Sequence, residues 1–112
     1  MLFRSDIEAD AIMASDHNAG LNGVAERFVA SRQWPRLPYG ADVVAANLLA
    51  PTLRDLASPI TEHCAPESVI VASGLLIGQW ETVADWYPNL TVVDRHQLDA
   101  WESVVLAPSG EV

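Results

Sequence analysis

The sequence is poor in basic residues, and this shortage argues against one class of partner. Six Lys and Arg stand against fifteen Asp and Glu, so the 112 residues carry a net charge of −9. Nucleic-acid binding depends largely on Lys and Arg that neutralise phosphates. We therefore expect no direct nucleic-acid binding, and an acidic chain favours neutral or basic partners.

Cysteine and long apolar runs are also scarce. The single cysteine, Cys64, excludes an internal disulfide and a cysteine-built zinc site, and it makes a cytoplasmic location the default expectation. The longest nearly uncharged run, Ser68–Trp80, is shorter than the roughly 20 apolar residues that span a bilayer. The start has no long apolar core of the kind found in signal peptides, so no membrane association is expected.

What the sequence does contain is an alternation of apolar strands and amphipathic helices. The pattern predicts strands at Leu2–Ser5, Arg27–Ser31, Ala41 to about Asn47, Ser68–Ser73, Leu90–Val93 and Ser103–Ala107, and helices at Ala9–Leu21, Pro51–Cys64 and Ile77–Tyr87. This order predicts an α/β fold with a mostly parallel sheet and helices on both faces. The last two strands have no helix between them and are expected to form an antiparallel hairpin.

Glycine and proline mark the expected boundaries. Asn22-Gly23 is expected to end the first helix, Trp34–Gly40 to form a loop, and Ala65–Glu67 to form a turn. Pro51 suits the first turn of the second helix, whereas Pro59 is expected to kink or divide it.

Two polar residues stand where ligands bind in parallel sheets, beyond the carboxyl ends of strands. Asp6 follows the first strand, and an acid at such a position can accept hydrogen bonds from the ribose hydroxyls of a cofactor. Asn47 closes the third strand after four apolar residues, and its amide could hold an amine substrate. Helix capping is the structural alternative for both residues, since Asp and Asn favour the positions before a helix.

The remaining polar and aromatic candidates have ordinary structural explanations. The three histidines, His17, His63 and His96, lack the spacing of a metal cluster, and no catalytic metal is expected. Trp34 in the proline-rich loop is a candidate substrate-side aromatic, with a loop anchor as the alternative. The aromatic side chains of the third predicted helix are expected to be mostly core, with one ring exposed.

The residues around Asp6 and Asn47 match a known family. The segments Asp6-Ile-Glu8, Asn18-Ala-Gly-Leu-Asn22-Gly-Val24 and Asp42-Val-Val-Ala-Ala-Asn47-Leu-Leu-Ala-Pro51 resemble the bacterial methyltransferases that modify ribosomal protein eleven of the large subunit. Ser73-Gly-Leu-Leu-Ile77 is similar to a further segment of that family. The resemblance extends from about Leu2 to Ala107.

The resemblance implies a Rossmann-like methyltransferase sheet, S-adenosylmethionine as methyl donor, and lysine side chains or an N-terminal amine of a protein as acceptors. It implies that Asp6 holds the cofactor ribose, that Ile7 packs on the adenine, and that Asn47 lies by the methyl group and the amine. Ser31 is a weaker candidate beside the adenine.

The family's first strand and glycine-rich loop have no counterpart in this sequence, which contains no G-x-G motif. We therefore interpret residues 1–112 as a single, partial catalytic domain that corresponds to the C-terminal portion of such an enzyme, with weak or no activity alone. The alternatives are a non-catalytic, methyltransferase-like module that self-associates or binds a partner chain through its incomplete sheet, and a nicotinamide-type nucleotide binder.

Overall fold

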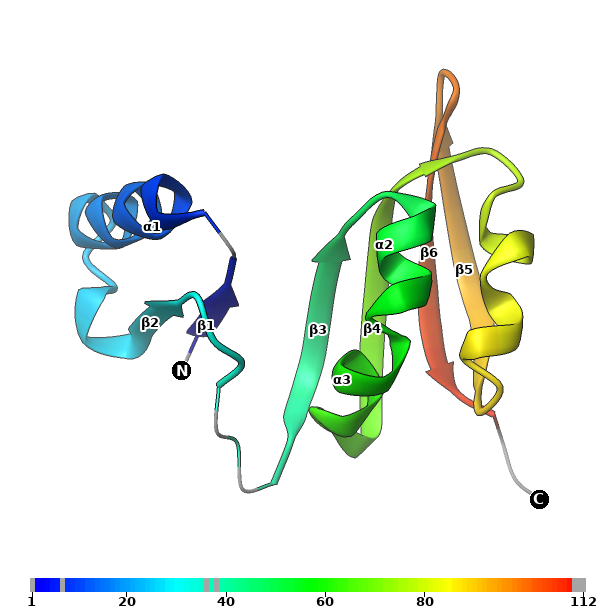
Figure 1. Ribbon diagram of the computed structural model, residues 1–112, viewed down its shortest axis with the longest axis horizontal. Coiled ribbons are helices and arrows are strands. Elements are labelled where there is room, and N and C mark those ends of the chain that lie inside the picture. Colours follow the sequence, from blue (N-terminus) through cyan, green and yellow to red (C-terminus); the bar gives the residue numbers. More distant parts are fainter. Residues whose placement is uncertain (1, 7, 36, 38, 110–112) are drawn as a thin grey trace. The chain divides into compact units, whose positions relative to one another are not determined.

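The chain folds into two compact units, residues 1–36 and residues 37–112, which we call the N-terminal and C-terminal units. The computed structural model describes residues 2–6, 8–35, 37 and 39–109 (Figure 1). None of the helices within these residues has both the length and the apolar character needed to cross a bilayer.

The N-terminal unit is a βαβ motif. It consists of β1 (Leu2–Ser5), α1 (Ala9–Leu21), the 3₁₀ helix η1 (Ala25–Arg27) and β2 (Phe28–Ser31). The two strands pair in parallel, from Leu2 opposite Phe28 to Ser5 opposite Ser31. The predicted end of the helix is confirmed, because Asn22 is the C-cap of α1 and Gly23 adopts a φ of 71°.

The C-terminal unit is a four-stranded mixed sheet with helices packed on it. Its elements are β3 (Ala41–Asn47), α2 (Ala50–Asp55), α3 (Ala57–Glu62), β4 (Cys64–Leu76), η2 (Trp80–Thr82), η3 (Ala84–Trp86), β5 (Leu90–Leu98) and β6 (Trp101–Pro108). The strand order is β3-β4-β6-β5, in which β3 and β4 are parallel and the other two pairs are antiparallel. The α/β class and the C-terminal antiparallel hairpin are therefore as the sequence predicts.

One face of this sheet carries the core. Alternate residues of β4 and β6, including Ile70, Ala72, Val104 and Leu106, are buried in one cluster with side chains of α2, α3 and η2. The Tyr87 hydroxyl crosses this core and donates a 2.7 Å hydrogen bond to the carbonyl of Leu53. Burial, together with the nearby Cys64, raises the pKa of Tyr87 to about 12.

Two sequence predictions in the C-terminal unit are wrong. The expected turn at Ala65–Glu67 is part of β4, where Pro66 lies between the paired residues Cys64 and Val69, beside an irregularity in the ladder that tolerates proline. The expected helix at Ile77–Tyr87 consists of the two single-turn 3₁₀ helices η2 and η3. Trp80, Val83 and Tyr87 are nevertheless buried, because single turns can bury the same spaced residues as one continuous helix.

The other helix and strand boundaries differ less from the predictions. The second predicted helix divides at Leu56 into α2 and α3, three residues before Pro59, and Pro51 occupies the first turn of α2 as predicted. The final hairpin is longer than expected in both strands, and β2 begins at Phe28 rather than Arg27. The aromatic prediction is confirmed, since Trp80 and Tyr87 are buried whereas Trp86 is half exposed.

Candidate functional site

Asn47 is the last residue of β3, at the carboxyl end of the parallel pair that β3 forms with β4. The strand register places it opposite Ser73, and the next residue, Leu48, donates its N–H to the carbonyl of Ser73 at 3.0 Å. The N-cap of α2 is Leu49, with no side-chain capping bond. Helix capping is therefore not the role of Asn47, whose exposed amide is available to a ligand.

Gly74 allows the chain to pass close to β4 just after Asn47. A Cβ atom at this glycine would lie 2.7 Å from Oδ1 of Asn47 and 3.0 Å from the carbonyl oxygen of Leu48. Gly74 also has a φ of 84°, which side-chain-bearing residues rarely adopt. The position of the Asn47 amide thus depends on a residue without a side chain on the neighbouring strand.

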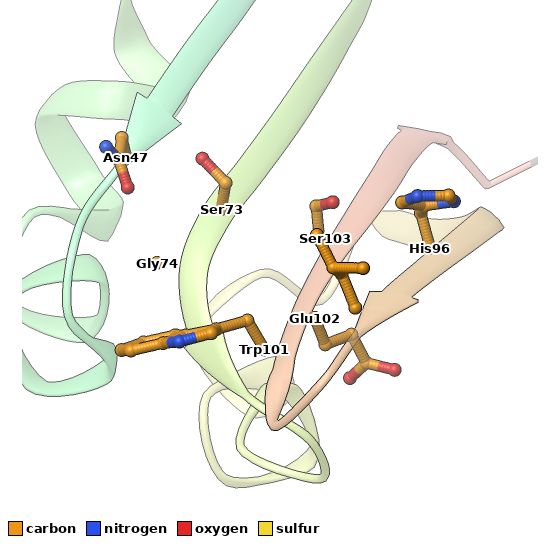
Figure 2. Close-up of a pocket in the computed structure, with 8 residues that line it drawn as sticks. Asn47, Ser73, Gly74, His96, Trp101, Glu102 and Ser103 are labelled. Atoms are coloured by element: carbon orange, nitrogen blue, oxygen red, sulfur yellow. The ribbon is translucent and has the colours of Figure 1, made fainter.

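A cavity of about 430 Å³ opens next to Asn47. Its lining comes from all four strands of the sheet, and the residues are Asn47, Ser73, Gly74, His96, Leu98, Trp101, Glu102 and Ser103 (Figure 2). This size lies within the range of small-molecule sites, and a mainly apolar lining with a few polar groups is typical of them. The structure therefore places the sequence candidate Asn47 on the wall of a cavity.

The polar groups of this cavity form a row across the sheet. Asn47 is opposite Ser73 on β4, and Ser103 of β6 is opposite His96 of β5. Ser73 follows Ala72, and Ser103 precedes Val104. Because Ala72 and Val104 are paired core residues and side chains alternate along a strand, both serines project from the face opposite the core. We call Asn47, Ser73, Ser103 and His96 the polar row.

Trp101 forms a wall beside the polar row. It begins β6, and its ring reaches from that strand toward the loop that follows Asn47 (Figure 2). Its exposed fraction is 53%, so a large part of the indole is open to a ligand. An exposed indole can bind a cation on its face as well as apolar groups on its edges.

Glu102 supports this wall from the core side of the sheet. Its carboxylate accepts hydrogen bonds from Nε2 of Gln97 at 2.9 Å and from Nη1 of Arg95 at 3.3 Å, and it points away from Asn47 in Figure 2. Arg95 also makes a two-pronged bond to Glu81 of η2, with distances of 3.1 and 3.2 Å. The bond from Gln97, aided by Arg95 and opposed by burial, lowers the pKa of Glu102.

Asp6 follows β1 in the N-terminal unit. Its carboxylate accepts a 3.1 Å bond from Nη2 of Arg4 and a 3.0 Å bond from the N–H of Glu8. The N-cap of α1 is Glu8, so Asp6 is not the capping residue, although it binds the N–H of the residue that is. The side chain is about a quarter exposed, which leaves part of the carboxylate accessible.

The other candidates of the N-terminal unit have different outcomes. Ile7 lies outside the described residues. Ser31 ends β2 and, with Trp34, lines a second cavity of about 190 Å³ on the face that carries Phe3 and Val29. Asp6 belongs to the N-terminal unit and Asn47 to the C-terminal unit.

Sequence reasoning missed most of the cavity around Asn47. His96 was considered only as a metal ligand, and Trp101 and Ser103 carried no motif. The signal that could have found them is the register of the final hairpin, which a sequence alone does not reveal. The described residues contain no cluster of three or more potential metal ligands.

Comparison with known proteins places these features in one family. The family model for ribosomal protein L11 methyltransferase (PrmA) matches residues 2–108. A ribosomal protein L11 methyltransferase of Aliivibrio salmonicida is 44% identical over 92 residues, which cover 80% of this chain and 31% of the relative. The ribosomal protein L11 methyltransferase of Rhodopseudomonas palustris is 32% identical over 111 residues, which cover 92% of this chain and 38% of the relative. The chain thus spans about a third of the length of these curated relatives.

Solved structures agree with the fold. A ribosomal protein L11 methylase of Lactobacillus delbrueckii subsp. bulgaricus has a TM-score of 0.85 at 19% identity, covering 96% of this chain and 57% of the other. An RNA methyltransferase of Salinibacter ruber, solved with S-adenosyl-L-homocysteine, has a TM-score of 0.71 at 18% identity, covering 98% and 67%. At these identities the likeness is one of fold.

Proposed function

The chain belongs to the ribosomal protein L11 methyltransferase family, and on that premise we propose that it carries part of an S-adenosylmethionine-dependent protein N-methyltransferase site. The proposed acceptors are lysine side chains or an N-terminal amine of a protein, and the names of the relatives support a ribosomal protein as substrate. The proposal treats residues 1–112 as one partial catalytic domain that acts in the cytoplasm.

The chemistry of the residues at two strand ends fits part of this cofactor. Asp6 offers a partly accessible carboxylate after β1, which is the acceptor that ribose hydroxyls require. Asn47 offers an exposed amide after β3, beside a cavity. In the proposal Asp6 and Ile7 hold the nucleoside part, and Asn47 lies by the reacting groups. The bound cofactor supplies an electrophilic methyl group on a sulfonium.

The position of Asn47 is the observation that carries the proposal. An amine attacks a methyl carbon only as the neutral base, in line, and from a distance of about 3 Å. The Oδ1 atom of Asn47 can accept a hydrogen bond from an N–H of that amine and so point the nitrogen lone pair away from itself. Gly74 keeps this amide against β4, which limits the directions that it can take.

We expect weak or no turnover from these residues alone. The chain spans about a third of its curated relatives, and it contains no G-x-G loop to cradle the remaining part of the cofactor. Cofactor binding is therefore a better test than turnover, because a partial site can retain affinity for the cofactor after it has lost the ability to transfer the methyl group.

The test is calorimetric titration of the 112-residue chain with S-adenosylmethionine. We expect saturable binding that weakens at least tenfold in Asp6→Ala, because the variant loses a charged hydrogen-bond acceptor worth about 1.5–3 kcal/mol. Asp16→Ala is the matched control, since it removes an exposed carboxylate from α1 of the same unit. Equal affinities for all three proteins, or no binding by a chain shown to be folded, would contradict the proposal.

A second candidate function rests on the unpaired edges of the two sheets. Among the described residues β1 pairs only with β2, and β3 pairs only with β4. The apolar run Val43–Ala46 in β3 is typical of a strand that is buried on both sides, yet Val43 is exposed. This pattern supports the alternative that the chain is a non-catalytic module that self-associates or pairs with another chain through such an edge.

Light scattering of the purified chain separates the two candidates. A monomer that binds S-adenosylmethionine favours the enzyme-like half-site. A stable dimer that does not bind it, and that Val43→Lys converts to a monomer, favours the module.

A further inference from the structure

The sheet of the C-terminal unit is apolar on the face opposite its core as well. Side chains alternate along a strand, so the residues between the core positions of β3, β4 and β6 point to this opposite face. We call it the outer face. An unbroken apolar run such as that of β4 is typical of a strand that is covered on both sides. The outer face nevertheless carries Val43, Ala45, Val69, Val71, Val105 and Ala107, none of which is buried.

The outer face has bulky side chains at one end and smaller ones at the other. At the bulky end Trp101 of β6 pairs with Leu76 of β4 and with Leu98 of β5, and all three side chains are exposed. At the small end Val43 of β3 pairs with Val69 of β4. A two-fold axis that runs across the strands would set the bulky end of one copy on the small end of another. The face is therefore complementary to itself in shape.

The charges of the outer face favour a second copy over a basic partner. In the stretches Val43–Asn47, Val69–Leu76 and Trp101–Ala107, no acidic or basic side chain points to it. A basic partner, which the net charge of −9 would otherwise favour, thus lacks acids to bind there. On the outermost strand, β5, Asp94 pairs with Val105 and His96 pairs with Ser103. The same two-fold axis brings Asp94 of one copy over His96 of the other.

The area of the outer face sets the strength of such a contact. Four strands spaced by about 4.8 Å are about 19 Å wide, and the stretch Val69–Leu76 is about 26 Å long. Each copy thus offers about 500 Å², and two copies bury about 1,000 Å² in total, which is near the lower limit for a specific protein interface. An interface of this size favours a reversible dimer rather than a permanent one.

We propose that two copies of this chain associate through the outer faces of their C-terminal units. The two sheets form a sandwich in which the strands of one copy run opposite to those of the other. The contact uses the faces of the sheets and needs no pairing at the edges of β1 and β3. Because the polar row crosses the outer face, each copy covers the cavity of the other. The association occurs without ligand and does not depend on the proposed function.

Sedimentation equilibrium of the 112-residue chain, from low-micromolar to near-millimolar concentration, tests this association. We expect a monomer–dimer equilibrium with a dissociation constant of tens of micromolar. The dimer should be tighter at high salt, because salt screens the repulsion between two chains that each carry a charge of −9. A folded chain that stays monomeric over the whole range, or a dimer that salt weakens, would overturn the proposal.

A charge on the outer face should break the dimer. Val71 lies on β4, which is paired on both sides, so Val71→Glu acts on the face and not on a strand edge. It should weaken the dimer at least tenfold, because the contact would bury an unpaired charge. Leu21→Glu makes the same change of charge at a residue of α1 that is 72% exposed, and it should leave the dimer unchanged.

A second variant removes the bulky end without adding a charge, in case Val71→Glu does not fold. Trp101→Ala should weaken the dimer about tenfold, as expected for an aromatic side chain that anchors an interface. Trp86→Ala is its control, because Trp86 is also half exposed but lies in η3, on the core side of the sheet. Equal dimer affinities for both tryptophan variants would contradict the proposed arrangement.

Nuclear Overhauser contacts between ¹³C-labelled and unlabelled copies locate the interface directly. We expect contacts from the Trp101 ring of one copy to the methyl groups of Val43 and Val69 in the other. Contacts confined to the edges of β1 or β3, in a dimer that survives Val71→Glu, would assign the association to the edges instead. A face dimer that does not bind S-adenosylmethionine would retain this inference and reject the proposed function, whereas a monomer that binds it would do the reverse.

Discussion

The two units of this chain differ in how they are stabilised. Of the described residues in the N-terminal unit only Ala19 is buried, whereas the C-terminal unit has a cluster of thirteen buried apolar residues from strands, helices and 3₁₀ turns. Their charges differ as well, since residues 1–36 contain five acids and four arginines, against ten and two in residues 37–112. The C-terminal unit has a core of its own, whereas the described residues of the N-terminal unit include a single buried side chain and form no comparable core.

The difference shows which contacts fix the position of each candidate residue. Asn47 is fixed by β3, β4 and Gly74, all within a packed unit. Asp6 is held by bonds to Arg4 and Glu8 and by its backbone N–H, which donates to the carbonyl of Ser31 at 3.1 Å, in a unit with little buried apolar surface among its described residues. We therefore expect ligand binding to increase local order more around Asp6 than around Asn47.

The largest expected effect comes from the core of the C-terminal unit. Leu53 of α2 is 1% exposed, and Leu53→Ala should lower the free energy of unfolding by about 2–5 kcal/mol through lost burial and a cavity. Leu21→Ala in α1 makes the same change at a residue that is 72% exposed, and it should cost less than about 0.5 kcal/mol. Urea denaturation of both variants measures the contrast, and equal losses would mean that the units do not differ as described.

The next effect concerns the backbone that holds Asn47. Gly74→Ala and Gly78→Ala both place a side chain at positive φ, 84° and 89°, which costs about 1–2 kcal/mol each. Only at Gly74 does the added Cβ also meet Asn47 and Leu48. Thermal unfolding should therefore show the greater loss for Gly74→Ala, and the side-chain amide signals of Asn47 should shift in that variant alone. A shift of the same size in Gly78→Ala would show that the position of the Asn47 amide does not depend on Gly74.

A smaller effect is the pH dependence of Glu102. Its pKa is lower in the folded chain than the usual value, so the ionised carboxylate stabilises the fold above that usual value of 4.5. This stabilisation is lost as the pH falls through the folded pKa. Glu102→Gln should thus lower the Tm at pH 7 and have progressively less effect below pH 4.

Glu81→Gln is the control for that experiment. Glu81 binds the same Arg95 from an exposed position, and exposed ion pairs add little to stability because solvent screens them. A pH-independent difference between Glu102→Gln and the unmodified chain would contradict the role of the Glu102 charge.

The smallest effect has the opposite sign. Ser68 of β4 is buried, and its hydroxyl has no hydrogen-bond partner in the part of the chain that the structure describes. Ser68→Ala removes a polar atom that burial penalises, so the variant should be as stable as the original chain or up to about 1 kcal/mol more stable. A loss above 1 kcal/mol in urea denaturation would indicate a partner for this hydroxyl.

The sequence predicted those elements whose conformation is determined by the local pattern of residues. The strand β3 ends at Asn47 as predicted, and Pro51 lies in the first turn of the next helix, which begins at Ala50. The segment Ile77–Tyr87 failed because Trp80, Val83 and Tyr87 have a spacing that an α-helix and successive 3₁₀ turns share. The end of β5 was missed because its residues after Val92 are all exposed, so this part of the strand has no alternation of buried and exposed residues to reveal it.

The candidate site was predicted only where one residue marks a strand end. Asn47 follows from the pattern of β3, but its partners Ser103 and His96 depend on the pairing of β6 with β4 and β5. That pairing is set by contacts between distant segments, and a shift of one residue would turn every side chain to the other face. No local pattern in the sequence carries that information.

The central claim is the proposal that this chain binds S-adenosylmethionine and that Asp6 and Asn47 each contact it. The most direct measurement is an NMR titration of the ¹⁵N-labelled chain with this cofactor, in which Asp6 and Asn47 report on the two units in the same spectrum. The account predicts that both residues shift with one common dissociation constant, and that Asp6→Ala weakens the response at Asn47 as well. Shifts confined to one unit, or two unrelated dissociation constants, would contradict it.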